Sequence, residues 1–537
     1  MPPKSGLSRR LFMGAGATLL GSSLVSGRAW AADLFPVVET ANGKLRGATA
    51  AGISVFKGVH YGASTAGDNR FMPPQPVEKW AGIRNALSFG DVSPQATGSR
   101  AYEYADLIVF DRQPAGPGED CLSLNVWTPS LDQQSSKPVI VVLHGGGFYA
   151  GSGNSFGMDG EAMARFADSV VISVNHRLGA FGFTYLGQLG GERYAGSGSV
   201  GMQDIVAALK WVKENVAQFG GDPNRVLVYG QSGGGAKTST LLAMPSAKGL
   251  FHRAGVMSGS MLTAGSPERA TENTVRLMKA LDIPTSDVER LQAVPFTTLL
   301  EAQTKLELAD RAKGEAPRAF GPIVDDVAIP RHPWSPDAPP QAHDVPMIIS
   351  TALDERTYRM SNYDLSEEGL LKFIRKRAGD KAEEVLALYR AEDADSTPFI
   401  IQARVDTDLG FRKAAFRQAE LKARAGGAPV WAYLWTWPSP AFDGRYGAVH
   451  GIDVGLSLYS IRGGLTGAQA DSKLMAERIS SAWAAFAATG DPNNEALPQW
   501  DAYEPTKRST MIFDMDTRQA YDPRAEIREM WQGIKMD

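Results

Sequence analysis

The sequence contains very little cysteine and histidine. Cys121 is the one cysteine among 537 residues, so the chain can form no intramolecular disulfide. The same scarcity excludes a metal site built on thiolates, and the seven histidines include no HExxH pattern or other close ligand pair. We therefore expect no bound metal, and the fold must be stable without covalent crosslinks.

An excess of charge of one sign is also missing. Lysine and arginine total 55 against 59 for aspartate and glutamate, and these residues are spread along the chain. Nucleic-acid-binding surfaces need clustered basic residues, so we expect no nucleic-acid partner. With 43% hydrophobic and 21% charged residues, the chain can bury a large core and shows no compositional sign of disorder. We expect a monomer or a weak homo-oligomer.

No long apolar run is present at the N-terminus. Residues 11–25 are moderately apolar but contain several glycines and serines, whereas a membrane-spanning helix needs about 20 mostly apolar residues. We therefore expect no stable membrane insertion. Residues 8–12 (SRRLF) precede this stretch and residues 29–31 (AWA) follow it, which is typical of a cleavable twin-arginine signal. Residues 1–31 are predicted to be that signal, and residues 32–537 a single domain.

The predicted twin-arginine signal has two consequences for the exported chain. Twin-arginine export carries proteins that have already folded, which agrees with a chain that makes no disulfides. Cleavage after Ala31 would remove four basic residues and no acid, so the formal net charge would change from −4 to −8. That charge favours solubility in the periplasm or outside the cell.

Short runs of β-branched and aliphatic residues predict strands that are buried on both faces of a parallel sheet. They span residues 138–143, 170–174 and 225–229, with further strands expected at 345–350 and 430–434. Between the second and third runs, apolar residues recur at spacings of three and four from Ile205 to Phe219, as on one face of a helix. This alternation predicts an α/β sheet with helices on both faces. Residues 267–312 and 366–426 are helical in period and are expected either to cap the sheet or to form ordinary surface helices.

A glycine-rich turn joins the third of these strands to the next helix. Residues 230–234 (GQSGG) directly follow residues 225–229 and precede a helix that is predicted over residues 235–243. This is the G-x-S-x-G nucleophile elbow in its required context, because glycines leave room for a sharp turn around a strained serine. The start of the helix also directs free N–H groups at that serine. We predict that Ser232 is a catalytic nucleophile rather than part of an accidental glycine turn.

A second glycine-rich element follows the strand at residues 138–143. Residues 144–147 (HGGG) match the element that supplies backbone N–H groups to a developing oxyanion. We predict that Gly146, Gly147 and the N–H of Gly233 form an oxyanion hole. A merely flexible loop is the alternative, but two motifs of one fold in the correct order make coincidence improbable.

A serine nucleophile needs a base, and in this fold the order along the chain is serine, acid, histidine. Four histidines follow Ser232. His252 lies too close to the nucleophile helix, whereas His332 and His343 precede the best acid candidate. His450, in a glycine-flanked loop, is therefore the predicted base.

The acid is expected at the carboxyl end of a strand between the serine and the histidine. Asp354 and Glu355 closely follow the apolar run at residues 345–350, and Asp325 and Asp326 are rivals. Spacing alone does not separate Asp354 from Glu355.

With these motifs in place, the sequence resembles the type-B carboxylesterase family, which includes cholinesterases and bacterial para-nitrobenzyl esterases. The resemblance covers most of the chain beyond the signal and implies an α/β-hydrolase fold, with a mostly parallel central sheet, helices on both faces and helical cap insertions. It is carried by the HGGG and GQSGG motifs and by residues 56–59 (FKGV), 70–74 (RFMPP), 119–126 (EDCLSLNV), 175–179 (NHRLG), 220–223 (GGDP), 352–355 (ALDE) and 489–493 (TGDPN).

The resemblance also implies roles for individual residues. The K-D-E-G element of the family places its catalytic glutamate where Glu355 stands, which implies a triad of Ser232, Glu355 and His450. The loop that carries the family's base is comparable, and Asp453 completes it here. Ser258, in residues 257–260 (MSGS), looks like the family's serine near the acid and the base.

The sequence departs from the family pattern at four positions. Gln231 precedes the nucleophile where glutamate is frequent, so a preference for cationic esters is doubtful. Gly233 replaces the usual alanine and is expected to loosen the elbow. His176 stands where tyrosine is common, and Arg356 replaces the glycine after the acid, so the local packing around both is in question.

These observations predict an exported serine carboxylesterase that acts on a small-molecule ester through an acyl-enzyme intermediate and without a cofactor. One alternative is a non-catalytic binding protein of the same family, which would have lost its nucleophile. Another is a hydrolase of amide, carbamate or lactone bonds. The aromatic series Trp431, Tyr433, Trp435 and Trp437 is expected to be strand packing rather than the wall of a substrate gorge.

The export signal can be tested by replacing both Arg9 and Arg10 with lysine. We expect the precursor to remain in the cytoplasm, because the twin-arginine pair is the feature by which the signal is read. Cell fractionation followed by an ester hydrolysis assay measures the outcome. Periplasmic activity that is undiminished by the double substitution would count against the signal.

Overall fold

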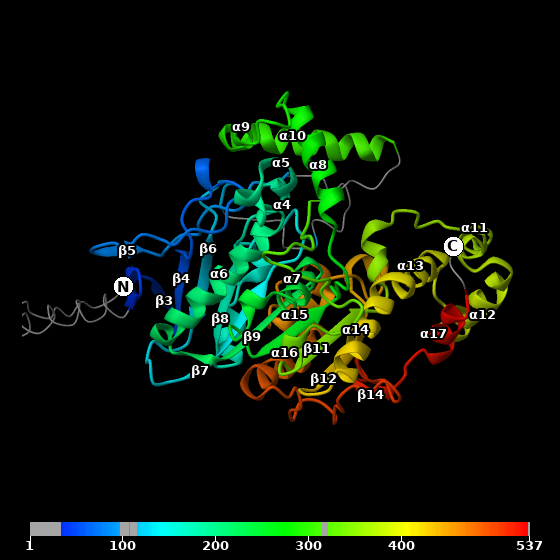
Figure 1. Ribbon diagram of the computed structural model, residues 1–537. Helices are drawn as coiled ribbons and strands as arrows, with labels where there is room; N and C mark the ends of the chain where they lie inside the picture. The colour runs from blue at the N-terminus through cyan, green and yellow to red at the C-terminus, as the bar shows by residue number, and fades with distance from the viewer. Residues whose placement is uncertain (1–33, 97–106, 108–114, 314–319, 535–537) are drawn as a thin grey trace, which may run out of the picture.

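The computed structural model describes residues 34–96, 107, 115–313 and 320–534, so the predicted signal at residues 1–31 lies outside the described residues. An eleven-stranded sheet lies in the middle of the molecule, and helices cover both of its faces (Figure 1). Its strand order is β14-β13-β12-β11-β10-β9-β7-β8-β6-β4-β3, and the strands from β13 to β8 in that order are parallel. The predicted mostly parallel sheet is confirmed.

The five predicted strands are all present. They correspond to β7 (Lys137–Leu143), β8 (Val170–Val174), β9 (Gly221–Gln231), β11 (Met347–Ala352) and β12 (Val430–Trp435). The other strands of the large sheet are β3 (Ala48–Ala50), β4 (Ile53–His60), β6 (Ser123–Thr128), β10 (Arg253–Met257), β13 (Ser509–Phe513) and β14 (Arg518–Tyr521). A small separate sheet contains β1 (Val37–Thr40), β2 (Gly43–Arg46) and β5 (Ile83–Asn85).

The predicted crossover helix is α6 (Val200–Asn215), which continues as a 3₁₀ turn over Val216–Phe219. The helix after the serine elbow is α7 (Gly233–Leu241). The remaining helices near the sheet are α3 (Glu161–Phe166), α4 (Gly179–Phe183), α5 (Gly187–Gly190), α15 (Ile452–Ser457) and α16 (Ala470–Thr489). Within the described part of the chain, no helix is both long enough and apolar enough to cross a membrane.

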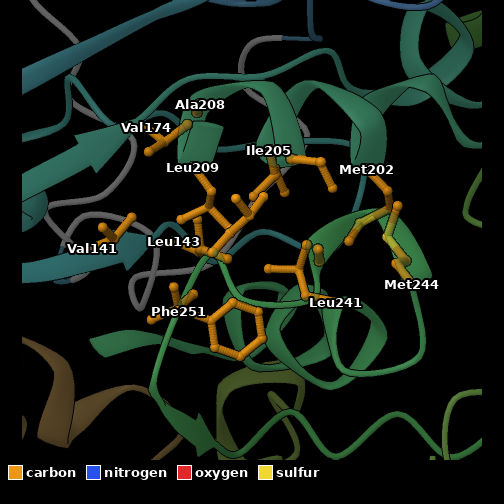
Figure 2. Packing of buried hydrophobic residues seen from close by; sticks show 14 of the residues in the cluster. Val141, Leu143, Val174, Met202, Ile205, Ala208, Leu209, Leu241, Met244 and Phe251 are labelled. Carbon is orange, nitrogen blue, oxygen red and sulfur yellow. The ribbon is translucent and has the colours of Figure 1, made fainter. Parts of the chain in front are cut away.

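Strand β7 shows why the central strands read as continuous apolar runs. Val139, Val141 and Leu143 belong to one hydrophobic cluster, whereas Ile140 and Val142 belong to another. Because successive side chains of a strand point to opposite faces, both faces of the sheet are buried. Figure 2 shows the first cluster, in which residues of α6 pack over the ends of β7 and β8.

The aromatic residues of β12 belong to the second cluster. Trp431, Tyr433 and Trp435 are buried, and Trp437 just beyond the strand is also buried. The Trp435 ring stacks against Phe513 of the neighbouring strand β13. The expectation that this aromatic series is strand packing is confirmed.

Both charged segments that were expected to be helical are helical. The first holds α8 (Pro267–Ala280), α9 (Glu289–Ala293) and α10 (Phe296–Ala312). The second holds α11 (Glu367–Ala378), α12 (Ala382–Glu392), α13 (Pro398–Thr407), a π-helical turn at Asp408–Arg412 and α14 (Lys413–Arg424).

The second helical segment has a small hydrophobic core of its own. Leu370, Ile374, Val385 and Val405 are buried there, together with Ile527 of α17 (Ala525–Gln532). Figure 1 shows α17 beside α12, at the opposite end of the molecule from β3. The single-domain organisation of residues 32–537 stays a prediction.

An ion pair is buried beside the first core. Both nitrogens of the Arg177 guanidinium that face Asp204 donate to its carboxylate, at 2.8 and 2.6 Å, and the Arg177 backbone N–H donates to it at 3.0 Å. The two side chains are about 1% exposed. The pair anchors the chain after β8 to helix α6.

Replacing Arg177 with methionine should therefore destabilise the fold strongly. The change leaves the Asp204 carboxylate buried without its partner, which costs about 3–5 kcal/mol in comparable buried pairs. Chemical denaturation of the variant and the wild type measures the loss. Arg193→Met is the matched control, because the Arg193–Glu289 pair is exposed and exposed pairs contribute little. Equal midpoints for the two variants would contradict the assignment.

Candidate active site

Ser232 lies at the carboxyl end of β9, between that strand and α7. Its backbone has φ 56° and ψ −119°, a region that a serine seldom adopts, as expected of a nucleophile elbow. The Ser232 N–H donates to Met257 O at 2.8 Å, and the Ser232 carbonyl accepts from the N–H of Ala236 at 2.9 Å. The side chain is half-buried. The strained turn is thus held from both sides by backbone hydrogen bonds.

Glycines around the elbow allow the backbones to approach closely. A Cβ atom on Gly234 would overlap the carbonyl oxygen of Leu143 at the end of β7. A Cβ atom on Gly259, which follows β10, would overlap the carbonyl oxygen of Ser232 itself. The serine therefore lies in a cradle of main chain that closes only around residues without a side chain.

The HGGG loop packs directly on this elbow. Gly146 and Gly147 have φ values of 88° and 63°, which favour glycine. A Cβ atom on Gly233 would overlap the backbone of Gly147. Gly233 was expected to loosen the elbow; in the structure, the missing methyl group instead lets the loop lie against the first turn of α7. The backbones of Gly147 and Gly233 are thus brought side by side.

Glu355 and His450 are in direct contact. The Nδ1 of His450 lies 2.5 Å from Glu355 Oε2, and the other carboxylate oxygen accepts from the N–H of Ala352 at 2.8 Å. Glu355 is fully buried and His450 is 4% exposed. A histidine held through Nδ1 keeps Nε2 available for proton transfer. Of the two acids that spacing left open, Glu355 is the one that contacts the histidine.

Two aromatic rings flank the His450 imidazole. The ring of Tyr358 stacks on it at a centroid distance of 4.7 Å, and the ring of Phe411 lies 5.0 Å away. Burial raises the pKa of Tyr358 above its usual value. These two rings restrict the orientations that the imidazole can take.

The π-helical turn at Asp408–Arg412 supports both partners of this contact. Phe411 supplies one of the rings beside His450. The buried Arg412 guanidinium donates to the carbonyls of Ala352 and Leu353, at 2.9 and 3.1 Å, just before the acid. Such π turns interrupt α-helices frequently at functional sites. This turn fixes the acid loop and the base together.

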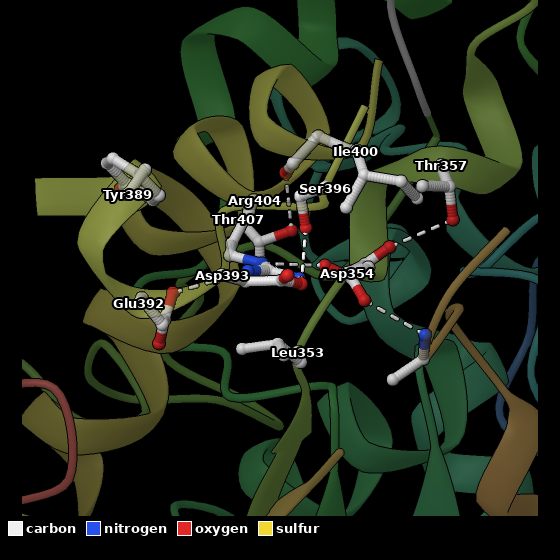
Figure 3. A network of polar contacts seen from close by, with 12 residues as sticks. Leu353, Asp354, Thr357, Tyr389, Glu392, Asp393, Ser396, Ile400, Arg404 and Thr407 are labelled. Carbon is white, nitrogen blue, oxygen red and sulfur yellow. Dashed lines mark hydrogen bonds and ion pairs between the residues drawn. The ribbon is translucent and has the colours of Figure 1, made fainter. Parts of the chain in front are cut away.

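Asp354 has a different task from its neighbour. Its carboxylate accepts from Arg404 Nε at 2.9 Å (Figure 3). The carboxylate also accepts from the N–H of Ala448 at 2.9 Å, and the Asp354 N–H donates to Ala448 O at 3.0 Å. Arg404 also contacts Glu392, and both Asp354 and Arg404 are buried. Asp354 therefore ties the acid loop to the loop that carries His450.

Asp453, which completes the histidine loop, is fully buried close to this pair. Burial raises its pKa to about 7, and the Tyr433 hydroxyl donates to its Oδ2 at 2.8 Å. The negative charge of Glu355 acts in the same direction as burial. The raised pKa favours the protonated carboxyl of Asp453, which carries no negative charge toward Glu355.

Ser258 lies directly after β10, next to the backbone that holds Ser232. Its φ is 48°, its N–H donates to Ser350 O at 2.9 Å, and its hydroxyl is buried with no hydrogen-bond partner among the described residues. The structure thus brings the Ser258 backbone to the elbow. A role for its hydroxyl toward the acid or the base stays a prediction.

The other departures from the family pattern are accounted for by packing. The Gln231 side chain is 5% exposed beneath the elbow, so it presents no negative charge there. His176 is buried with its ring stacked on His144 at 4.9 Å. The guanidinium of Arg356 lies over the ring of Phe411.

The rival acids and histidines lie in other contacts. Asp325 accepts from three backbone N–H groups of its own turn, and Asp326 is exposed. His343 pairs with Asp344, while the Nδ1 atoms of His252 and His332 accept from backbone N–H groups at 3.3 Å. In the described part of the chain, no group of three His, Cys, Asp or Glu side chains is placed to hold a metal ion.

Several residues of the site were not predicted from the sequence. Tyr358, Phe411 and Arg412 have no local motif, and only tertiary packing brings them to the acid and the base. Lys237, which is fully buried on α7, could have been noticed as a lone cation on a helix of small and apolar residues.

The chain is similar to proteins of one known family. The model of the carboxylesterase family matches residues 35–531 of the chain. The para-nitrobenzyl esterase of Bacillus subtilis (strain 168) is 33% identical over 499 residues, which cover 92% of this chain and 98% of that protein. The phenmedipham hydrolase of Pseudarthrobacter oxydans is 35% identical over 495 residues, covering 89% and 94%. A solved esterase from the anaerobe Clostridium hathewayi, described as able to hydrolyse aliphatic aromatic polyesters, superposes with a TM-score of 0.80 at 32% identity, covering 93% of this chain and 98% of its own.

The fold and the site therefore define a carboxylic-ester hydrolase of the α/β-hydrolase fold. The chain belongs to the carboxylesterase family.

The two adjacent acids can be separated by substitution. Glu355→Gln keeps the size of the side chain but removes the carboxylate from His450, so kcat should fall by about 10⁴-fold, as when the orienting acid of a serine protease triad is amidated. Asp354→Asn should mainly lower the free energy of unfolding, because it weakens the contact with Arg404. Steady-state kinetics and denaturation on the same preparations measure both effects. A larger loss of kcat in Asp354→Asn than in Glu355→Gln would reverse the assignment.

Proposed function

We propose that this chain is an exported serine carboxylesterase that cleaves carboxylic esters through an acyl-enzyme, with Ser232, Glu355 and His450 as its catalytic triad. The contact between Glu355 and His450 is the observation that carries the proposal, because it joins two residues 95 positions apart in the arrangement that this chemistry requires.

In the first step, His450 takes the proton of the Ser232 hydroxyl as the oxygen attacks the ester carbonyl. Glu355 orients the imidazole and stabilises the positive charge that it acquires. The carbonyl oxygen becomes an oxyanion, which the backbone N–H groups of Gly146, Gly147 and Gly233 stabilise. His450 then returns the proton to the departing alcohol.

The second step repeats this chemistry with water. His450 takes a proton from the water molecule, whose oxygen attacks the acyl-enzyme carbonyl, and the same N–H groups stabilise the second oxyanion. Collapse of this intermediate returns the proton to Ser232 and releases the carboxylate. The residues of the chain can supply every proton transfer in this sequence.

The surroundings of the serine favour an uncharged, partly apolar substrate. Tyr149 is 41% exposed beside the oxyanion loop, and Tyr358 and Phe411 line the base. Gln231, rather than a carboxylate, lies beneath the serine. The site therefore has aromatic surface for an acyl or alcohol group and little to attract a cation.

The alternatives are weaker. A binding protein that has lost catalysis would not need a strained serine, a held histidine and a buried acid together. Cleavage of amide, carbamate or lactone bonds would use the same groups, but an alkoxide leaves more readily than an unprotonated amine, which favours esters. Export by the twin-arginine pathway is part of the proposal and rests on residues 8–12 and 29–31.

Ser232→Ala tests the proposal directly. We expect kcat on a panel of esters to fall by about 10⁶-fold, as after removal of the nucleophile in subtilisin. A burst of alcohol release by the wild type, absent in the variant, would report the acyl-enzyme. Ser286→Ala is the control, since Ser286 is an exposed turn residue whose change should leave kcat unaltered. Full activity in Ser232→Ala would refute the nucleophile.

A further inference from the structure

Lys237 is a fully buried lysine on the helix that begins at the nucleophile. It lies five residues after Ser232 on α7, and its relative exposure is 0%. Burial in a low-dielectric interior costs an ammonium group several kcal/mol unless the charge is compensated, so such lysines are rare. The proposed mechanism gives Lys237 no task.

The ammonium of Lys237 donates to the carbonyl of His144 at 2.9 Å. His144 is the residue between β7 and the glycines that are proposed to bind the oxyanion. This hydrogen bond therefore joins the nucleophile helix to the start of the oxyanion loop. It is made by a long side chain that lies wholly within the protein, so its length sets how closely the two elements approach.

Two neutral histidine rings surround this contact. The rings of His144 and His176 are stacked, with 13° between their planes. Each Nδ1 donates to a backbone carbonyl, at 2.8 Å to Gly145 and at 2.9 Å to Arg177, so each Nε2 carries a lone pair rather than a proton. Both Nε2 atoms are buried and lack a hydrogen-bond partner among the described residues. Burial, and next the charge of Lys237, lower the pKa of both rings well below the usual value.

No carboxylate compensates Lys237. Within the described residues it forms no ion pair, and Asp204 of the adjacent helix α6 is occupied by Arg177. The other charged groups on the elements that pack against α7 lie at the ends of β7, β9 and β10 that are far from Ser232, or on the exposed face of α6. They are Lys137, Asp222, Arg225, Arg253, Lys210, Lys213 and Glu214. Tyr229 of β9 stacks on Trp483 and belongs to the hydrophobic cluster on the other face of the sheet.

We propose that Lys237 is a positioning residue for the oxyanion loop, and that its uncompensated charge stabilises the oxyanion formed there. This inference rests on the proposed function. Before the reaction, no anion balances the ammonium; when the ester carbonyl becomes an oxyanion, an opposite charge appears on the loop that the ammonium holds. A favourable interaction that exists only in the transition state raises kcat without tightening substrate binding.

Lys237→Met tests the proposal, because it keeps most of the side-chain volume and removes both the donor and the charge. We expect kcat/KM to fall by about 10-fold to 10²-fold with little change in KM, which is less than the loss of a direct oxyanion donor. Lys237→Gln retains an N–H donor without the charge and should recover part of the loss. The matched control is Lys422→Met, since Lys422 is also buried and donates to two carbonyls, those of His343 and Ala428, but lies on α14 away from the serine.

Binding of an aryl trifluoromethyl ketone distinguishes an effect on the oxyanion from a loss of structure. The Ser232 oxygen adds to the ketone carbon, its proton passes to His450, and the carbonyl oxygen becomes a stable oxyanion. In Lys237→Met, the affinity for the trifluoromethyl ketone should fall by the same factor as kcat/KM. The affinity for an uncharged, non-reacting analogue should not change. Equal losses for both ligands would mean that Lys237 has only a structural role and would overturn the proposal.

The pH dependence supplies a measurement on the wild type alone. Burial holds the pKa of Lys237 well below its usual value, so the charge is present at low pH and is lost as pH rises through that pKa. The kcat/KM of the wild type should therefore fall on the alkaline side, and Lys237→Met should lack this decline while Lys422→Met keeps it. If Lys237→Met does not fold, a wild-type profile without an alkaline decline still overturns the proposal.

These outcomes are distinguishable from a failure of the proposed function. If the wild type hydrolyses no ester and Ser232→Ala equals it, the serine mechanism fails before Lys237 is tested. If the wild type is active and Ser232→Ala is not, any difference between Lys237→Met and Lys422→Met belongs to Lys237.

Discussion

The edge of the sheet that carries Ser232 depends on the close packing of main chain around this one strained residue. The end of β7, the turn after β10 and the first turn of α7 meet at Ser232, and each approach is possible only because a glycine stands at the point of contact. This packing constrains the backbone conformation of Ser232. It also brings the backbones of Gly147 and Gly233 into contact beside the serine. Side chains farther away can support this arrangement but cannot replace it.

Glu355 and His450 are supported by helices and loops rather than by close packing of glycines. Glu355 follows β11, and part of the support for Glu355 and His450 comes from the helical segment at residues 366–426. Arg404 and Arg412 donate from that segment to the acid loop, and Phe411 packs on the imidazole. The sheet therefore provides a common edge, while the inserted helices support the contact between Glu355 and His450.

Local sequence patterns predicted the strands and the two glycine-rich turns at their ends because each depends on neighbouring residues. A buried strand reads as a continuous apolar run, and a tight turn reads as glycines. The choice between Asp354 and Glu355 could not follow from spacing, because both end the same strand and only their contacts with Ala448 and His450 separate them. The resemblance to a known family made that choice.

Contacts between residues far apart in the chain could not be predicted from local sequence patterns. Nothing in the sequence near Phe411 or Arg412 indicates which loop the π turn will face. For Gly233, the expected loosening came from comparing one residue with another, without knowledge of the backbone that lies against it. The structure supplies that backbone and shows that a side chain at this position would overlap Gly147.

The position of α17 has a consequence for how the enzyme becomes active. This last described helix contributes Ile527 to the core of an insertion that begins about 160 residues earlier in the chain, and Arg524 at its start contacts Asp408 of the π turn. During synthesis, the insertion can fold onto the sheet but cannot complete its interior until the final segment leaves the ribosome. The π turn that packs on His450 would thus lack its contact with Arg524 until synthesis of the chain is nearly finished.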